Sequence, residues 1–397
     1  MTPRQRLVEL DVLRGFSVAV MILVTCPGSW AFTYPQLQHA GWHGWTFADF
    51  VFPDFLFGVG MALGLAYGNS LNPHSDPRAF WLKVARRVFG LIALGLTLNA
   101  VYLLSWRLGA EPVGPEGHDG LRIPGVLQRI ALVYLIALAV LRLSSRRTEN
   151  ARIRILPSIL VASIALCLIG YWLLLTLIPV PGFDPGDLTI AGNLPGYVDR
   201  LVFGTQHMWA LGSESWRGPI FYDPEGLLST IPASVNVLFG VLAVKIWQGG
   251  SSRRIPILAC MGLALVVAGL LLDPVFPINK KLWTSSFALL TSGLSFLAFL
   301  TAAALVSAPS RILVAPLKML GGNAIVAFSI SVVLSAMASV PLATSSGAKP
   351  LQQLGFELFS SQISDPYVAS LGYAVSALAL VALLLLPLDR KGIHVRL

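Results

Sequence analysis

The chain has 397 residues, of which 55% are hydrophobic and 12% are charged. A soluble domain carries about 25% charged residues, so this chain has too few to cover a folded surface in water. The composition excludes a soluble enzyme, a nucleic-acid-binding protein and a secreted disulfide-rich domain, and it indicates an integral membrane protein. The net charge of +9 does not by itself indicate an anionic partner, because the loops on one side of a membrane protein are basic.

Apolar runs bounded by charged residues, Pro or Gly predict ten membrane-spanning helices, since about 20 apolar residues in a helix cross a bilayer. The predicted spans are 12–32, 47–68, 86–105, 124–142, 155–178, 227–247, 255–272, 282–305, 320–341 and 367–387. The expected fold class is therefore an all-α integral membrane bundle of about ten helices, forming a single transmembrane domain over residues 1–397.

The distribution of Arg and Lys predicts the orientation of the bundle. These residues gather at both chain ends and in alternate loops, near 78–87, 142–154, 245–254 and 311–318. Because basic loops stay in the cytoplasm, both termini are expected to be cytoplasmic. The longest loop on the other side, 179–226, is rich in Gly and Pro and is expected to form a small extracytoplasmic cap.

Two charged residues lie in the first predicted span. Asp11 and Arg14 are three positions apart at its cytoplasmic end, so they share one face of a helix. They form either an ion pair that anchors the helix or part of a binding site.

Ionisable residues also enter the second predicted span from its outer end. His39 and His43 are followed by Asp49 and Asp54, and a His beside a carboxylate is the arrangement that a general base needs. The alternative is a belt of His and Trp side chains at the membrane interface. A metal site of both histidines and Asp49 lacks a third nitrogen or sulfur ligand, so no metal is expected.

Gln128 and Arg129 open the fourth predicted span, where Arg129 must face protein, water or an anion. Arg129 either pairs internally with a carboxylate such as Asp49 or Asp54, or contacts a substrate.

Three further motifs each have two interpretations. Asp223 before Pro224 is either a helix N-cap or a contact to a polar acceptor. Lys280 and Lys281 on the outer side indicate either an anionic contact or a membrane anchor. Asn323 follows two glycines, where helices can pack closely and an amide can form a hydrogen bond across them.

Seven motifs in chain order then resemble one family. They are LDVLRG (10–15), HAGWHG (39–44) with Asp49 and Phe52-Pro53, RIPGVLQR (122–129), GYVDR (196–200), YDPEG (222–226), NKKLW (279–283) and GNA (322–324). Together they extend over nearly the whole chain and resemble the heparan-alpha-glucosaminide N-acetyltransferase family.

The resemblance implies an enzyme that takes acetyl from cytoplasmic acetyl-CoA, its cosubstrate, and delivers it to the amine of a glucosamine-type sugar across the membrane. The family's active histidine falls on His39, which Asp49 would orient. His39 would act as a general base or as a transient acetyl acceptor. The residues expected to contact acetyl-CoA or the acceptor are Asp11, Arg14, Arg86, Arg87, Gln128, Arg129, Asp223, Glu225, Asn279, Lys280, Trp283 and Asn323.

The resemblance also implies partners and a location. The partners would be acetyl-CoA, an amino-sugar or glycan acceptor, the lipid bilayer and a second copy of the chain in a homodimer, but no nucleic acid. Lysosomal members have a further luminal domain and span, so ten spans rather than eleven indicate a multi-pass protein of a bacterial inner membrane.

The chain departs from the family pattern at three positions. His43 and Thr25 stand where Asn is expected, and Asp54 stands where an aromatic residue is expected. These departures leave the acceptor contacts open. The alternative functions are a transporter of amino sugars or small anions, with the same polar groups forming a midplane site, and a non-catalytic partner in an envelope-sugar assembly.

Overall fold

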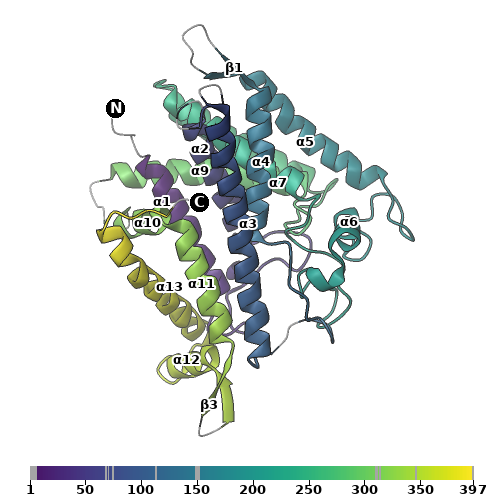
Figure 1. Ribbon diagram of the computed structural model, residues 1–397, viewed down its shortest axis with the longest axis vertical. Coiled ribbons are helices and arrows are strands. Elements are labelled where there is room, and N and C mark those ends of the chain that lie inside the picture. The colour runs from purple at the N-terminus through teal and green to yellow at the C-terminus, as the bar shows by residue number, and fades with distance from the viewer. Residues whose placement is uncertain are drawn as a thin grey trace.

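In the computed structural model, the chain folds almost entirely into helices (Figure 1). The structure describes residues 7–67, 69, 71–73, 76–111, 114–147, 153–308, 312, 314–344 and 347–395. Over these residues the α-helices are α1 (Val8–Thr25), α2 (Phe47–Ala66), α3 (Pro77–Arg107), α4 (Val126–Leu143), α5 (Pro157–Leu177), α6 (Leu194–Phe203), α7 (Thr230–Gln248), α8 (Arg254–Leu272), α9 (Ser285–Ser307), α10 (Val314–Gly322), α11 (Ala324–Ala338), α12 (Leu351–Ser360) and α13 (Pro366–Arg390).

Two short antiparallel hairpins complete the secondary structure. Strand β1 (Ser145–Arg147) pairs with β2 (Ile153–Ile155), and β3 (Pro341–Thr344) pairs with β4 (Gly347–Pro350). Neither hairpin belongs to a larger sheet. The helices alone therefore form the body of the protein.

Eight described helices are long and apolar enough to cross a membrane, namely α2, α3, α4, α5, α7, α8, α9 and α13. This confirms the predicted class, a polytopic helical membrane protein. Helix α1 overlaps the first predicted span, 12–32, over residues 12–25, and it carries Glu9, Asp11 and Arg14 within 18 residues. Both chain ends (1–6 and 396–397) and parts of two basic loops (148–152 and 309–311) lie outside the described residues.

The span predicted at 320–341 is wrong as a continuous helix. Helices α10 and α11 meet at an angle of 84° around Asn323. The cause is a close crossing of α10 and α1, because a Cβ atom on Gly321 would lie 1.8 Å from the Asp11 carbonyl oxygen, and one on Gly15 would lie 1.8 Å from the Leu317 carbonyl oxygen. The glycines therefore allow α10 to lie across α1 instead of continuing into α11.

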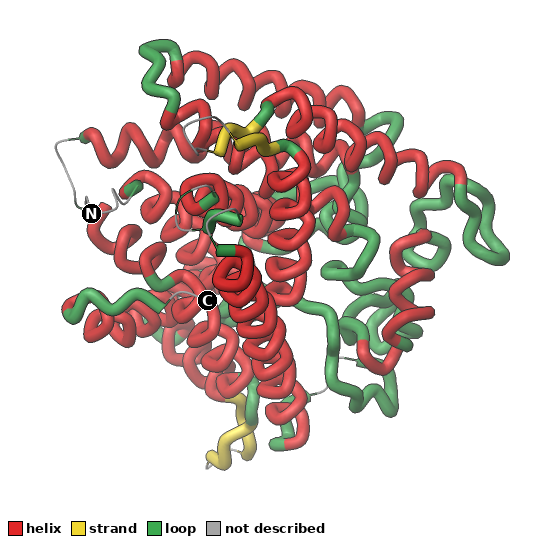
Figure 2. The backbone as a smooth tube through the Cα atoms, turned by 45° about the horizontal axis from the view of Figure 1, so that its top comes forward, coloured by secondary structure: helices red, strands yellow, loops and turns green. Residues whose placement is uncertain are grey.

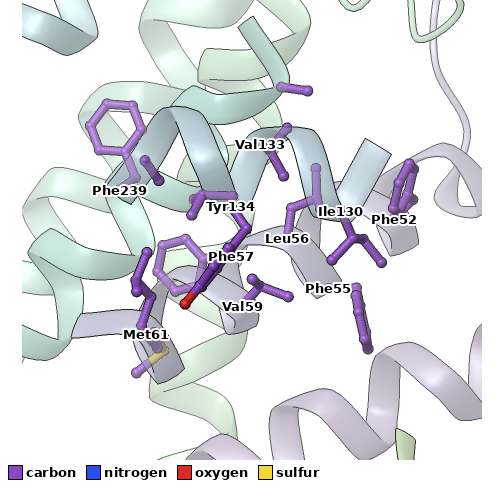
Figure 3. Close-up of a cluster of buried hydrophobic side chains, with 14 of the residues drawn as sticks. Phe52, Phe55, Leu56, Phe57, Val59, Met61, Ile130, Val133, Tyr134 and Phe239 are labelled. Carbon is purple, nitrogen blue, oxygen red and sulfur yellow. The ribbon is translucent and has the colours of Figure 1, made fainter. Parts of the chain in front are cut away.

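Helix α2 is the centre of the bundle, and most of its side chains are buried. Figure 3 shows its aromatic and aliphatic side chains in one cluster with those of α4 and α7. Gly60 and Gly240 bring the α2 and α7 backbones together, because a Cβ atom on Gly60 would lie 1.9 Å from the Val237 carbonyl oxygen and one on Gly240 would lie 2.0 Å from that of Phe57. This packing fixes the helix that carries Asp49.

The segment 179–226, predicted to be a cap, contains turns, α6 and a short 3-10 helix at Thr205–His207. Figure 2 shows the long loops around α6 gathered on one side of the molecule. The segment ends at Tyr222–Gly226, directly before α7, and so carries Asp223 and Glu225 toward the bundle.

Candidate active site

The loops before α2 and before α9 meet at the first turns of these helices. Gly44 N donates a hydrogen bond to the Ile278 carbonyl oxygen at 2.7 Å, and Gly44 and Asn279 form a single parallel bridge. Gly44 has a φ of +91°, in the left-handed region that favours glycine. This backbone contact between the two loops brings His39 and Lys280 together, although 241 positions separate them in the chain.

His39 and Asp49 form a hydrogen-bonded pair. Their Nδ1 and Oδ1 atoms are 2.8 Å apart, and 44% of the His39 side chain is exposed against 1% of that of Asp49. A carboxylate only accepts, so Nδ1 carries the proton and Nε2 is the ring's acceptor. The second Asp49 oxygen accepts from the backbone N of Ala40 at 3.1 Å and of Thr46 at 3.0 Å. These bonds hold the carboxylate in one orientation in the first turn of α2.

Lys280 lies against both members of this pair. Its Nζ atom is 2.9 Å from His39 Nδ1, 3.1 Å from His39 Nε2 and 3.4 Å from Asp49 Oδ1. Burial and the Lys280 ammonium both lower the pKa of His39, against the opposing effect of the Asp49 carboxylate. His39 is therefore neutral at pH 7, which is the form that can take a proton.

A second ion-pair group lies where the cap segment meets the start of α4. Arg122 donates to Asp223 Oδ2 at 2.9 Å, to Asp223 Oδ1 at 2.6 Å and to Glu225 Oε2 at 2.5 Å. Asp223 also accepts from the backbone N of Trp209 at 2.8 Å. The two carboxylates raise the pKa of Arg122 despite its burial. The N-cap interpretation of Asp223 is wrong, because α7 begins only at Thr230.

Arg129, in the first turn of α4, is fully buried. Its Nη2 atom donates to the Gly226 carbonyl oxygen at 3.0 Å and to Ser229 Oγ, and its guanidinium lies 5.0 Å from the centre of the Trp283 ring. The alternative of an ion pair with Asp49 or Asp54 is therefore wrong. Arg129 instead joins α4 to the segment before α7 and to the loop before α9.

Trp283 has an unusual backbone conformation. Its φ is +53°, which is rare for a large side chain and costs about 1–3 kcal/mol. Its side chain is buried, and its Nε1 donates to Asn236 Oδ1 at 3.0 Å. These contacts hold the turn that presents Lys280 to His39.

Comparison with known proteins identifies the family. The model of the catalytic region of heparan-alpha-glucosaminide N-acetyltransferase matches residues 6–188. The human heparan-alpha-glucosaminide N-acetyltransferase is 33% identical over 326 residues, covering 73% of this chain and 47% of the human protein. The mouse protein of that name is 31% identical over 326 residues, covering 73% of this chain and 48% of the mouse protein.

The chain belongs to the heparan-alpha-glucosaminide N-acetyltransferase family. It spans about half the length of these two relatives. The region matched by the family's catalytic model includes His39, Asp49, Arg122 and Arg129, whereas Lys280 and Trp283 lie beyond it.

Five of the residues expected to contact acetyl-CoA or the acceptor lie away from His39. Asp11 and Arg14 are in the first turns of α1, and Arg86 and Arg87 are in the first half of α3. His39 lies between the C-terminal end of α1 and the N-terminal end of α2, and α3 follows the C-terminal end of α2. The first turns of α1 and the first half of α3 therefore lie toward the opposite end of the bundle from His39. Asn323 donates to the Ile393 carbonyl oxygen at 3.2 Å and accepts from Val395 N at 3.0 Å.

The other predicted residues mostly have protein partners. Gln128 Nε2 donates to the Ile123 carbonyl oxygen at 3.0 Å. Asn279 is buried, and its Oδ1 accepts from Leu282 N at 2.8 Å. In the part of the chain that the structure describes, no group of three His, Cys, Asp or Glu side chains could hold a metal ion.

Sequence reasoning did not single out Arg122 and Ser229, which form hydrogen bonds with predicted site residues. Arg122 stood in a quoted motif, but its partner Asp223 is 101 positions away. Ser229, which accepts from Arg129, gave no signal beyond its position at the end of a loop. Only the fold shows that Arg122 and Asp223 join two segments of the site.

Proposed function

We propose that the protein is a membrane-bound acetyltransferase. It transfers acetyl from acetyl-CoA on the cytoplasmic side to the amine of a glucosamine-type sugar on the other side. The observation that carries the proposal is the His39–Asp49 pair at 2.8 Å, with the ring's acceptor nitrogen, Nε2, on a partly exposed side chain. The names of the human and mouse relatives support the same reaction class.

His39 Nε2 is the reacting nitrogen. In direct transfer it takes a proton from the acceptor amine while the amine attacks the thioester carbonyl. In the two-step route Nε2 attacks the thioester first and passes the acetyl to the amine. Asp49 stabilises the imidazolium in the first route and fixes the tautomer in both.

Positive charge beside His39 assists either route. The Lys280 ammonium lies within 3.1 Å of both ring nitrogens. Negative charge develops on the thioester oxygen as the carbonyl is attacked, and a cation held nearby lowers the energy of that state.

The acetyl donor enters from the other end of the bundle. Arg14, Arg86 and Arg87 would bind its phosphates through charge-assisted contacts, as the basic character of that end favours. The long pantetheine arm would then carry the thioester toward His39. The setting that we propose is a bacterial inner membrane, with a second copy of the chain as partner.

Acetyl transfer by the purified full chain tests the proposal. Wild type, His39→Ala and His43→Ala are incubated in detergent with radiolabelled acetyl-CoA and glucosamine. We expect transfer by wild type, its loss in His39→Ala, and its retention in His43→Ala, because His43 lies against the Asn279 amide and the Trp42 ring, whereas His39 is the histidine that pairs with Asp49. Undiminished transfer by folded His39→Ala would contradict the proposal. Uptake of sugar into liposomes without acetyl-CoA would favour a transporter instead.

A further inference from the structure

Lys280 places a primary amine against the ring nitrogen that acts in the proposed reaction. Its Nζ atom lies 3.1 Å from His39 Nε2, and 13% of its side chain is exposed. A general base must lie within about 2.6–3.2 Å of the atom from which it takes a proton. The Lys280 amine therefore meets the distance requirement that an acceptor sugar amine must meet.

The two amines cannot both contact Nε2 in the same way. With Nδ1 donating to Asp49, Nε2 has one acceptor position. Lys280 Nζ is 3.1 Å from Nε2 and 2.9 Å from Nδ1, so it lies against the ring, beside this position. A sugar amine that reaches Nε2 therefore competes with the Lys280 amine for the same base. When no sugar is present, the amine next to the base is that of Lys280.

We propose that Lys280 is an internal acetyl acceptor, which the active site acetylates on Nζ when acetyl-CoA is bound and no sugar amine is present. The inference rests on the proposed function, because it needs the thioester to reach His39. It assigns a modification site and gives the pair of adjacent lysines different roles.

The chemistry balances without a further reactant. His39 Nε2 takes a proton from the Lys280 ammonium, and the neutral amine attacks the thioester carbonyl carbon. The C–N bond forms, the C–S bond breaks, and the amine loses its second proton to the surroundings. The CoA thiolate takes the proton from the His39 imidazolium, so the products are acetyl-lysine, CoA thiol and one released proton.

Burial lowers the pKa of Lys280, which increases the fraction of neutral amine, although Asp49 opposes that shift. Acetylation replaces the ammonium by a neutral amide and removes its charge interaction with Asp49. It also leaves an amide beside His39, where the acceptor must bind. Self-acetylation is therefore expected to slow transfer to the sugar.

Lys281 is the matched control that the chain provides. Burial lowers its pKa to about 8, so its amine is also reactive. Its Nζ atom, however, donates to the Gly41 carbonyl oxygen and lies 5.9 Å from the centres of the Trp42 and Tyr222 rings. Reactivity alone predicts acetylation of both lysines, whereas position beside His39 predicts acetylation of Lys280 only.

The experiment uses the full chain in detergent with radiolabelled acetyl-CoA and no sugar. Treatment with neutral hydroxylamine removes acetyl from imidazole but not from lysine, and peptide mass spectrometry then locates the acetyl group. The variants are Lys280→Arg, Lys281→Arg and His39→Ala. Transfer to glucosamine by wild type is measured on the same preparation.

We expect hydroxylamine-stable acetyl on Lys280 in wild type and in Lys281→Arg, and none in Lys280→Arg or His39→Ala. Saturating glucosamine should lower the labelling at least about tenfold, because its amine competes with that of Lys280 for the same base and the same thioester. Wild type that acetylates glucosamine but carries no acetyl on Lys280 would overturn this inference alone. Acetyl on Lys281, or equal labelling in His39→Ala, would overturn it as well. If wild type acetylates neither glucosamine nor itself, the proposed function fails together with the inference.

Discussion

At the scale of single residues, the site depends on the orientation of one imidazole. Asp49 accepts from His39 Nδ1, and two backbone N–H groups hold its other oxygen. An amide in place of the carboxylate keeps the shape but removes the charge that stabilises imidazolium. For Asp49→Asn we expect a fall in kcat of about 10⁴-fold, as for the equivalent change in the Ser-His-Asp triad.

Steady-state transfer kinetics check that expectation, with the thermal unfolding midpoint as the control for folding. The midpoint should stay close to that of wild type, since the Asn side-chain oxygen can still accept from the backbone N–H groups of Ala40 and Thr46. Full activity in Asp49→Asn would mean that the carboxylate has no part in the reaction.

Lys280 sets the pH range in which His39 works. Burial, and after it the Lys280 ammonium, lower the pKa of His39 below the ordinary value of about 6.5. The base is active when neutral, that is, above its pKa, so activity is kept at pH 7 and is lost as the pH falls through the lowered value. Lys280→Met removes the charge, and we expect the acidic limb of the pH–rate profile to move to higher pH.

The profile is measured with one acceptor throughout, so the ionisation of the acceptor amine is the same for every variant. Lys280→Arg is the control, because it keeps the positive charge and should keep the acidic limb near its original position. An acidic limb that is identical in wild type and Lys280→Met would show that the ammonium does not act on His39.

Asp54 is a buried carboxyl group that forms no ion pair with any of the described residues. It is fully buried in α2, and its Oδ2 atom lies 2.6 Å from Ser17 Oγ, which also lies 3.0 Å from the Leu13 carbonyl oxygen. A hydroxyl has one hydrogen, so both contacts are satisfied together only if Asp54 is protonated and donates to Ser17. A protonated acid resembles an amide in its donor and acceptor groups.

We therefore expect Asp54→Asn to change the free energy of unfolding by no more than about 1 kcal/mol, the net contribution of one hydrogen bond. Asp54→Lys places an unpaired charge in the same space and should destabilise by several kcal/mol. Unfolding in detergent at constant pH measures both. A large loss of stability in Asp54→Asn would show that the carboxylate form is the one required.

At the scale of helices, the apolar runs predicted most elements well. The span predicted at 47–68 is α2, at Phe47–Ala66, because a mostly apolar run has few other stable conformations in lipid. The break at Asn323 was not predicted. Gly321 and Gly322 indicated close packing, but only the tertiary structure shows that the neighbour is α1 and that α10 crosses it. Contacts between distant segments, such as Lys280 with His39, are outside the reach of local patterns for the same reason.

The crossing of α1 and α10 should tolerate no side chain at Gly321. A Cβ atom there would lie 1.8 Å from a backbone oxygen, which cannot rotate away. For Gly321→Leu we expect a loss of about 3 kcal/mol or more, at the upper end of overpacking effects. Gly170→Ala in α5 is the control, since nothing lies within 4 Å of its Cβ position. Equal unfolding midpoints for Gly321→Leu and wild type would contradict the close crossing.

At the scale of the whole molecule, the ionisable groups of the proposed site occupy two ends of an apolar bundle. His39, Asp49, Lys280 and the Arg122 ion pairs lie at the first turns of α2, α4 and α9, and the basic residues of α1 and α3 lie toward the other end. The outer helices α5 and α8 expose most of their apolar side chains. Only 22% of the apolar stretch of α5 and 17% of that of α8 is buried. These are the surfaces that lipid, or a second copy of the chain, would cover.

This arrangement leads to the most direct test of the account, the sidedness of transfer. Oriented proteoliposomes of wild type and His39→Ala receive radiolabelled acetyl-CoA on the face that carries Arg86 and Arg87, and glucosamine on the opposite face. We expect N-acetylglucosamine to form in the glucosamine compartment with wild type and not with His39→Ala. Product that forms only when both substrates are on the same face, or that forms equally with His39→Ala, would contradict acetyl transfer across the membrane through His39.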